Sequence, residues 1–264
     1  MNMKSFKHQT DLPRTTIQQQ YTALSKNVDD KHVLSFISRF NTADDLIPKP
    51  PIKYPVFQGG GAKGNAYAGA YCALDEQGYL DEIACPGGAS AGGIVAFFMA
   101  LGFDGKQFTY ASEKLNFLDF TDLKKDGWGS YLDGHKVGIA LDLFQQGGAY
   151  SGENFHNWAS HFVEQILGNK DATFKDLHDL KSVDPTLKDL LLVATHYGTS
   201  SHAQQVFSFE TTPHVVLADA LRATMSFPGA FTPWEVREKV GESRSKPIYK
   251  SLGFFADGGI LNNF

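Results

Sequence analysis

The order of hydrophobic and polar positions predicts strands that alternate with helices. A short apolar run at 54–58 leads into glycines and then into 65–77, where apolar residues recur at helical spacing. A second unit has the same order, with apolar residues at 83–85, a turn, and a helix over 91–101 that ends at Gly102. This alternation is typical of an α/β fold with a mainly parallel central sheet.

The rest of the chain continues the alternation with fewer sharp signals. Residues 103–150 are rich in Gly, Asp and aromatic side chains with poor periodicity, and we interpret them as an insertion or lid between core elements. We expect helices over 109–119, over 151–167 (capped by Ser151 and closed by Gly168) and over 213–223 (with Pro213 in its first turn), and strands over 189–196 and 254–256.

Three glycine-rich turns follow expected strands and complement one another chemically. The turn at 59–64 offers unpaired backbone N–H groups at a helix start, where the macrodipole favours negative charge. The turn at 88–92 reads Gly-Ala-Ser-Ala-Gly, the form of a nucleophile elbow, and the turn at 257–259 supplies a carboxylate. Together they predict an acyl hydrolase, with Ser90 as nucleophile, Asp257 as base, an oxyanion hole at Gly59, Gly60, Gly61 and Gly64, and turn support from Gly88, Gly92, Gly258 and Gly259.

A nucleotide site is the alternative interpretation of the first turn. Gly59, Gly61 and Gly64 also match the dinucleotide pattern G-x-G-x-x-G. That site needs a second strand ending in an acid about 20 residues on. Asp81 and Glu82 follow only a Tyr-Leu pair, which is too short to be a convincing strand. The chain also lacks the Gly-Lys-Ser/Thr of a P-loop after these glycines, so the hydrolase interpretation is favoured.

Taken together, these motifs resemble the patatin-like phospholipases, including bacterial members of effector type. That family has a Gly-Gly-Gly-x-Lys/Arg-Gly loop, a Gly-x-Ser-x-Gly elbow and an Asp-Gly-Gly/Ala turn, and all three occur here in order. The strand pair 191–195 and 205–208 and the small-residue stretch 222–233 fit as well. The resemblance covers 54–263. It implies a three-layer α/β/α fold with a Ser–Asp dyad at the carboxyl ends of the strands, and no metal or cofactor.

In the mechanism that the resemblance implies, Asp257 accepts the proton of Ser90 and later activates water against the acyl-enzyme. The amides of Gly60 and Gly61 are then the expected oxyanion donors. An ordinary α/β-hydrolase places its histidine after the acid in chain order, but no histidine follows Asp257 in this sequence. A histidine could therefore belong to a catalytic triad only if another residue than Asp257 supplied the acid. The histidines considered for that role are His196, His202 and His214.

The charge distribution and the length of the chain indicate how it is divided into domains and which partners are disfavoured. Residues 1–53 carry a net charge of +3 and the remainder −8, which disfavours a nucleic-acid partner. We expect an N-terminal extension with a Pro-rich linker over 1–53 and a patatin-like catalytic domain over 54–264. Asp257 lies seven residues before Phe264, so we also expect the natural domain to continue, because a base in a fraying terminus is a poor catalyst.

Location and partners follow partly from the residues and partly from the resemblance. Residues 1–14 lack the apolar segment of a secretory signal peptide, and the apolar run at 94–101 is too short to span a membrane. We therefore expect any membrane contact to be peripheral, and the resemblance implies a phospholipid membrane surface as the partner. The resemblance implies secretion into a host cell and a eukaryotic activator protein there, if the source is bacterial. Cys72 and Cys85 form no disulfide framework.

The substrate class depends on the resemblance. Aromatic residues that follow the elbow could line an acyl groove, although most must be ordinary core; they are Phe97, Phe98, Phe103, Phe108, Phe117 and Phe120. The resemblance to the family favours glycerophospholipids as substrates over small water-soluble esters. Lys63 could contact the phosphate group of such a lipid. A catalytically silent binding module is the second alternative, against which the intact Ser90 and Asp257 speak.

Overall fold

A computed structural model describes residues 51–114, 120, 148–198 and 203–264 of the chain. From Ile52 onward these residues belong to one compact unit. Almost all of the expected N-terminal extension, most of the expected insertion, Phe117 and His202 lie outside the described residues. The domain boundary at 53/54 stays a prediction.

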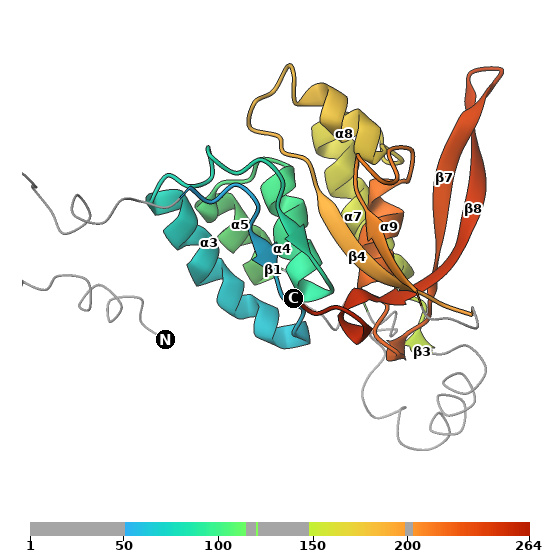
Figure 1. Ribbon diagram of the computed structural model, residues 1–264, viewed down its shortest axis with the longest axis horizontal. Coiled ribbons are helices and arrows are strands. Elements are labelled where there is room, and N and C mark those ends of the chain that lie inside the picture. The colour runs from blue at the N-terminus through green and yellow to red at the C-terminus, as the bar shows by residue number, and fades with distance from the viewer. Residues whose placement is uncertain (1–50, 115–119, 121–147, 199–202) are drawn as a thin grey trace, which may run out of the picture. The chain divides into compact units, whose positions relative to one another are not determined.

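The described part is built on a mixed six-stranded sheet, of which Figure 1 labels β1, β4, β7 and β8. Strands β1, β2 and β4 run parallel to one another. Strands β5 and β8 pair antiparallel with β4, and β7 pairs antiparallel with β8. The strand order is β1-β2-β4-β8-β7, and β5 also pairs with β4. The strands are β1 (Val56–Phe57), β2 (Gly87–Gly88), β4 (Leu191–His196), β5 (Gln204–Phe207), β7 (Trp234–Ser243) and β8 (Lys246–Asp257). The predicted α/β class is confirmed. Two of the parallel strands, β1 and β2, are each followed directly by a predicted glycine-rich turn.

Strand β4 lies in the middle of the sheet and pairs with three other strands, two of which share one of its edges. β5 pairs along residues 192–195 of β4. β2 pairs with Leu192 through Gly88, and β8 pairs with Ala194 through Asp257. A strand has only two edges, so β2 and β8 share the one that β5 leaves free. They arrive from opposite directions, and their paired residues lie two positions apart along β4, about 7 Å.

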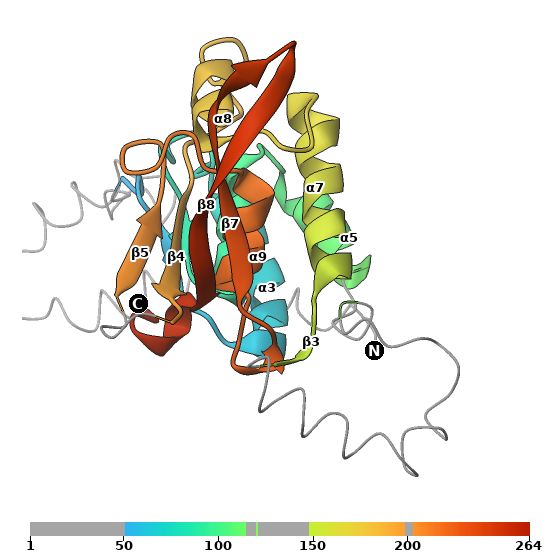
Figure 2. The same cartoon turned by 90° about the vertical axis from the view of Figure 1, so that its right-hand side faces the viewer.

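Helices α4 and α9 contact the sheet directly, and α7 packs on α9. In Figure 2, α9 lies next to β7, and α7 lies beside α9. The helical elements are η3 (Gly61–Ala66), α3 (Tyr67–Glu76), α4 (Ala91–Ala100), α5 (Gly105–Lys114), α7 (Glu153–Leu167), α8 (Phe174–Leu180), α9 (Leu217–Thr224) and η6 (Gly258–Ile260). The short strands β3 (Gly148–Tyr150) and β6 (Gly229–Phe231) form a second, parallel pair.

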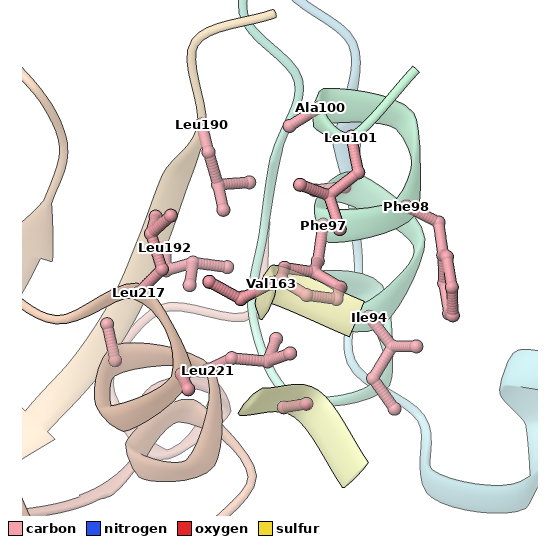
Figure 3. Close-up of a cluster of buried hydrophobic side chains, with 14 of the residues drawn as sticks. Ile94, Phe97, Phe98, Ala100, Leu101, Val163, Leu190, Leu192, Leu217 and Leu221 are labelled. Atoms are coloured by element: carbon pink, nitrogen blue, oxygen red, sulfur yellow. The ribbon is translucent and has the colours of Figure 1, made fainter. Parts of the chain in front are cut away.

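The centre of the core lies around α4, whose ten residues are all buried. A helix that is apolar on every side must be enclosed by other elements. Figure 3 shows Phe97 of α4 among side chains of β4, α7 and α9, including Leu192, Val163 and Leu221. Burial of a Phe or Leu side chain of this kind contributes roughly 1.5–3 kcal/mol. The core therefore fixes the start of α4, where the predicted nucleophile lies.

Several predicted elements are placed differently in the structure. The strand expected at 83–85 is wrong, because the pairing residues are Gly87 and Gly88. Pro213 is not in a helix, since its carbonyl accepts from the Lys175 N–H and α9 begins only at Leu217. Ser151 is not the N-cap of α7. That position is held by Gly152 in the left-handed region, and Ser151 Oγ accepts from the Glu153 N–H instead.

The expected final strand at 254–256 is the end of a long hairpin. β7 and β8 are joined by a tight turn at Arg244 and Ser245, both with positive φ of 49° and 61°. Figure 1 shows this hairpin, in red, extending past the helices. The hairpin delivers Asp257 to the middle of the sheet, next to β4.

Candidate active site

Ser90 lies in a strained backbone conformation between β2 and α4. Its φ of 52° and ψ of −129° fall where a non-glycine residue is rarely found. Glycines allow the close approach that this turn needs. A Cβ on Gly88 would lie 2.3 Å from the Gly92 carbonyl oxygen, and one on Gly92 would lie 1.9 Å from the Phe57 carbonyl oxygen. The predicted elbow glycines are therefore required by the packing of α4 against β1 and β2.

The Ser90 backbone is held by Thr224, the last residue of α9. Thr224 Oγ1 accepts from the Ser90 N–H at 2.9 Å and donates to the Val193 carbonyl oxygen of β4 at 2.5 Å. Thr224 is completely buried. One hydroxyl thus links the elbow to the central strand, and it satisfies an amide that would otherwise be unpaired at the helix start.

Asp257 ends β8 with its backbone fixed on both sides. Its N–H donates to the Ser226 carbonyl at 2.9 Å, and its carbonyl accepts from Thr195 Oγ1 at 3.0 Å. The backbone of the next residue, Gly258, packs closely against β4, because a Cβ on Gly258 would be 2.0 Å from the Val193 carbonyl oxygen. The carboxylate accepts from the Gly259 N–H through Oδ1 at 2.7 Å.

The Asp257 residue is 2% exposed, and among the described residues its Oδ2 atom accepts no hydrogen bond. Burial raises the pKa of Asp257 above its ordinary value, while the Ser90 hydroxyl and the Gly259 N–H act in the opposite direction. Ser90 and Asp257 lie near the same atom, Asn263 Oδ1, because a Cβ on Gly59 would be 2.8 Å from that oxygen and from Ser90 Cβ, and one on Gly259 would be 3.1 Å from that oxygen and from Asp257 Oδ1. A buried carboxylate with one oxygen unoccupied and a serine beside it is the arrangement that a general base needs.

Both residues converge on the same stretch of β4. Gly88 pairs with Leu192 and Asp257 pairs with Ala194, while Val193 between them receives the Thr224 hydroxyl. No histidine of the described part of the chain hydrogen-bonds with Ser90 or Asp257. His196 packs its ring on Phe255 at a centroid distance of 4.8 Å.

The predicted oxyanion loop lies against the elbow. A Cβ on Gly59 would be 2.8 Å from Ser90 Cβ, and one on Gly64 would be 3.0 Å from Ala91 Cβ. The Gly59 N–H already donates to Asn263 Oδ1 at 2.7 Å. Gly60 and Gly61 stand at the start of η3, where backbone N–H groups have no acceptor inside the helix. Their two amides are thus the candidate donors to an oxyanion.

Sequence reasoning missed two polar side chains at this site, Thr224 and Asn263. Thr224 falls in the small-residue stretch at the end of α9 and Asn263 in the tail behind the base, so neither belongs to a motif with a known spacing. Asn263 follows the Asp-Gly-Gly turn in an Asn-Asn pair, which is a weak signal for a polar contact. Only the tertiary structure brings these two residues next to the elbow and the oxyanion loop.

Several hydrophobic side chains near the site are exposed, whereas most of the aromatic residues after the elbow are core. Phe227 is 61% exposed, and Ile260, Leu261 and Phe264 are about half exposed. The residues Phe97, Phe98, Phe108 and Phe120 are buried, and Phe103 packs partly against the core. Among the described helices, none combines the length and the apolar character that a membrane crossing requires.

Comparison with known sequences agrees with the motifs. The family model of patatin-like phospholipases matches residues 56–264. The protein YqhO of Bacillus subtilis (strain 168) is 27% identical over 219 residues, which are 79% of this chain and 64% of YqhO. The probable lipid hydrolase 463L of invertebrate iridescent virus 6 is 23% identical over 234 residues, which are 88% of this chain and 69% of the viral protein.

Solved structures show the same fold. VipD from Legionella pneumophila has a TM-score of 0.53 at 22% identity, over 82% of this chain and 47% of VipD. ExoU of Pseudomonas aeruginosa, in its complex with SpcU, has a TM-score of 0.51 at 28% identity, over 69% of this chain and 38% of ExoU. This chain thus spans less than half of the VipD chain and less than half of the ExoU chain. The fold, the ordered motifs and the family match together show that the chain belongs to the patatin-like phospholipase family.

Proposed function

We propose that this chain is a lipid acyl hydrolase of the phospholipase A or lysophospholipase type, with its catalytic domain over 54–264. The observation that carries the proposal is the meeting of Ser90 and Asp257 on one edge of β4. The serine is held at a strained elbow. The buried carboxylate beside it has a raised pKa and an Oδ2 atom that accepts no hydrogen bond from the described residues. The family of the chain supplies the substrate class.

The proposed reaction has two halves. Asp257 accepts the Ser90 hydroxyl proton as Oγ bonds to the ester carbonyl carbon, and the carbonyl oxygen becomes an oxyanion beside the amides of Gly60 and Gly61. Breakage of the ester bond releases the alcohol, which takes the proton back from Asp257. Water then attacks the acyl-enzyme while Asp257 accepts its proton, and the fatty acid leaves as Ser90 regains a proton.

Hydrolysis of phospholipid vesicles tests the proposal. Phosphatidylcholine vesicles should release free fatty acid with the wild-type chain and none above background with Ser90→Ala. Absence of any release, with or without eukaryotic cell extract, from any phospholipid or lysophospholipid offered would contradict the proposed function. A gain on addition of extract would support the further proposal of a host activator protein, and the complex of ExoU with SpcU makes a protein partner worth testing.

The two alternatives make different predictions. A silent binding module would bind vesicles but leave Ser90 unreactive toward a fluorophosphonate. A nucleotide-binding protein would bind a dinucleotide at the first turn. Against that use, the Gly59 N–H is already occupied by Asn263 and the loop is closed against Ser90. Titration with a dinucleotide should therefore show no saturable binding.

A further inference from the structure

The side chain of Asn263 lies between the oxyanion loop and the base turn. Its Oδ1 accepts from the Gly59 N–H at 2.7 Å, and its Nδ2 donates to the Gly59 carbonyl at 3.3 Å. The two contacts fix the orientation of the amide, because only the oxygen can accept and only the nitrogen can donate. Asn263 thus holds both polar groups of one peptide residue that lies 204 positions away in the sequence.

The same oxygen atom lies close to the catalytic groups. A Cβ on Gly59 would be 2.8 Å from Asn263 Oδ1 and 2.8 Å from Ser90 Cβ. A Cβ on Gly259 would be 3.1 Å from Asn263 Oδ1 and 3.1 Å from Asp257 Oδ1. Asn263 therefore occupies the narrow space where the oxyanion loop, the nucleophile and the base turn meet.

Gly59 directly precedes the two amides assigned to the oxyanion. It lies between β1 and η3 in a run of three glycines, so its own side chain cannot fix the loop, and glycine has more backbone freedom than any other residue. A clamp on both polar groups of Gly59 removes that freedom. Because the Gly59 carbonyl and the Gly60 N–H belong to one planar peptide unit, the clamp also sets the direction in which the Gly60 N–H points.

We propose that Asn263 is a positioning residue that clamps the oxyanion loop to the base turn, so that the loop amides and Asp257 face Ser90 at the same time. This inference rests on the proposed function. Because small misplacements in an active site cost large rate factors, loss of the clamp slows the chemical step more than it weakens substrate binding.

Phosphonylation of the 264-residue chain by a fluorophosphonate tests the proposal, since it reports the serine without knowledge of the natural lipid. We expect Asn263→Ala to react on the order of 10- to 100-fold more slowly. On phospholipid vesicles kcat should fall while KM stays close to wild type. Asn262→Ala is the matched control, because Asn262 has the same side chain in the same tail but contacts Gln204 and Phe264 instead. It should react at the wild-type rate within about twofold.

Asn263→Asp gives a second readout that a purely structural residue would not move. The carboxylate can still accept from the Gly59 N–H, but it cannot donate to the Gly59 carbonyl and it adds a negative charge beside Asp257. A like charge disfavours ionisation of a neighbouring carboxyl group, so the acid limb of the rate profile should move to higher pH. This variant keeps the test open if Asn263→Ala folds poorly.

The outcomes distinguish failure of the clamp from failure of the proposed function. If wild type itself is not phosphonylated, with or without eukaryotic cell extract, the proposed function fails and takes this inference with it. If wild type reacts and Asn263→Ala reacts equally fast, only the clamp is wrong. An Asn263→Asp profile that coincides with wild type, or a rate loss in Asn263→Ala that merely follows its unfolded fraction, would also overturn the clamp.

Discussion

Replacement of Thr224 by valine removes the hydroxyl that ties the elbow to the central strand and keeps the shape of the side chain. In wild type that hydroxyl accepts from the Ser90 N–H and donates to the Val193 carbonyl, and all three residues are buried. The valine variant leaves a buried N–H without a partner and removes one donor from a buried carbonyl. Each such loss costs about 1–3 kcal/mol, so we expect the free energy of unfolding to fall by roughly 2–6 kcal/mol.

Thr224→Ser is the matched control, because it keeps the hydroxyl and loses only the methyl group. That methyl packs near α4, where a Cβ on Gly93 would be 2.9 Å from Thr224 Cγ2. Loss of one buried methyl group costs about 1 kcal/mol. The control should therefore be more stable than the valine variant and should retain the backbone geometry of Ser90.

Two measurements on purified protein decide the matter. Urea unfolding gives the free energies of the two variants, and the rate of phosphonylation by a fluorophosphonate reports the elbow. Thr224→Val should react at least about tenfold more slowly than Thr224→Ser when both are fully folded, because the Ser90 backbone loses its tether. Equal stability and equal reactivity of the two variants would refute the assignment of Thr224 to the elbow.

Three further predictions concern backbone strain, close packing and the buried carboxyl group. Ser90→Gly should unfold with a free energy about 1 kcal/mol higher than Ser90→Ala in urea titrations, because only glycine accepts φ of 52° without strain; the reverse order would contradict the elbow geometry. Gly92→Ala should fail to give a cooperative thermal transition, since its Cβ would overlap the Phe57 carbonyl, whereas Gly69→Ala in the open part of α3 should gain about 0.5–1 kcal/mol; similar melting curves for the two would be inconsistent with the packing. Asp257→Asn should raise the free energy of unfolding at neutral pH. Burial raises the pKa of Asp257 in the folded state, so stability is lost as pH rises through that value, and the gain should vanish below the unfolded pKa of about 3.9.

The elements that the sequence predicted well are those with both a period and a stop signal. The helix 91–101 was expected from its apolar run and Gly102, and α4 spans Ala91–Ala100. Gly168 closes α7 in the left-handed conformation, as predicted from a glycine after a periodic segment. The three turns follow β1, β2 and β8 as predicted, because the close backbone approaches at Gly59, Gly88 and Gly258 leave no room for a side chain.

The elements that were missed depend on distant parts of the chain. The turn at Arg244 and Ser245 lacks the Asn-Gly or Asp-Gly signal of a tight hairpin, so the long β7–β8 ribbon could not be predicted. The residues at 83–85 are apolar, yet the strand forms at Gly87 and Gly88, because the pairing is set by β1 and β4 on either side. Thr224 and Asn263 gain their roles only from contacts that span more than a hundred residues of sequence.

The central claim is that Ser90 is an activated nucleophile and Asp257 is its base. Its most direct test is the rate and position of fluorophosphonate attachment, determined by mass spectrometry of wild type, Ser90→Ala and Asp257→Asn. We predict a single adduct on Ser90 in wild type, none in Ser90→Ala, and a reaction slowed by at least about 100-fold in Asp257→Asn, whose amide cannot accept the proton. An adduct on another residue, or an unchanged rate in Asp257→Asn, would contradict the dyad.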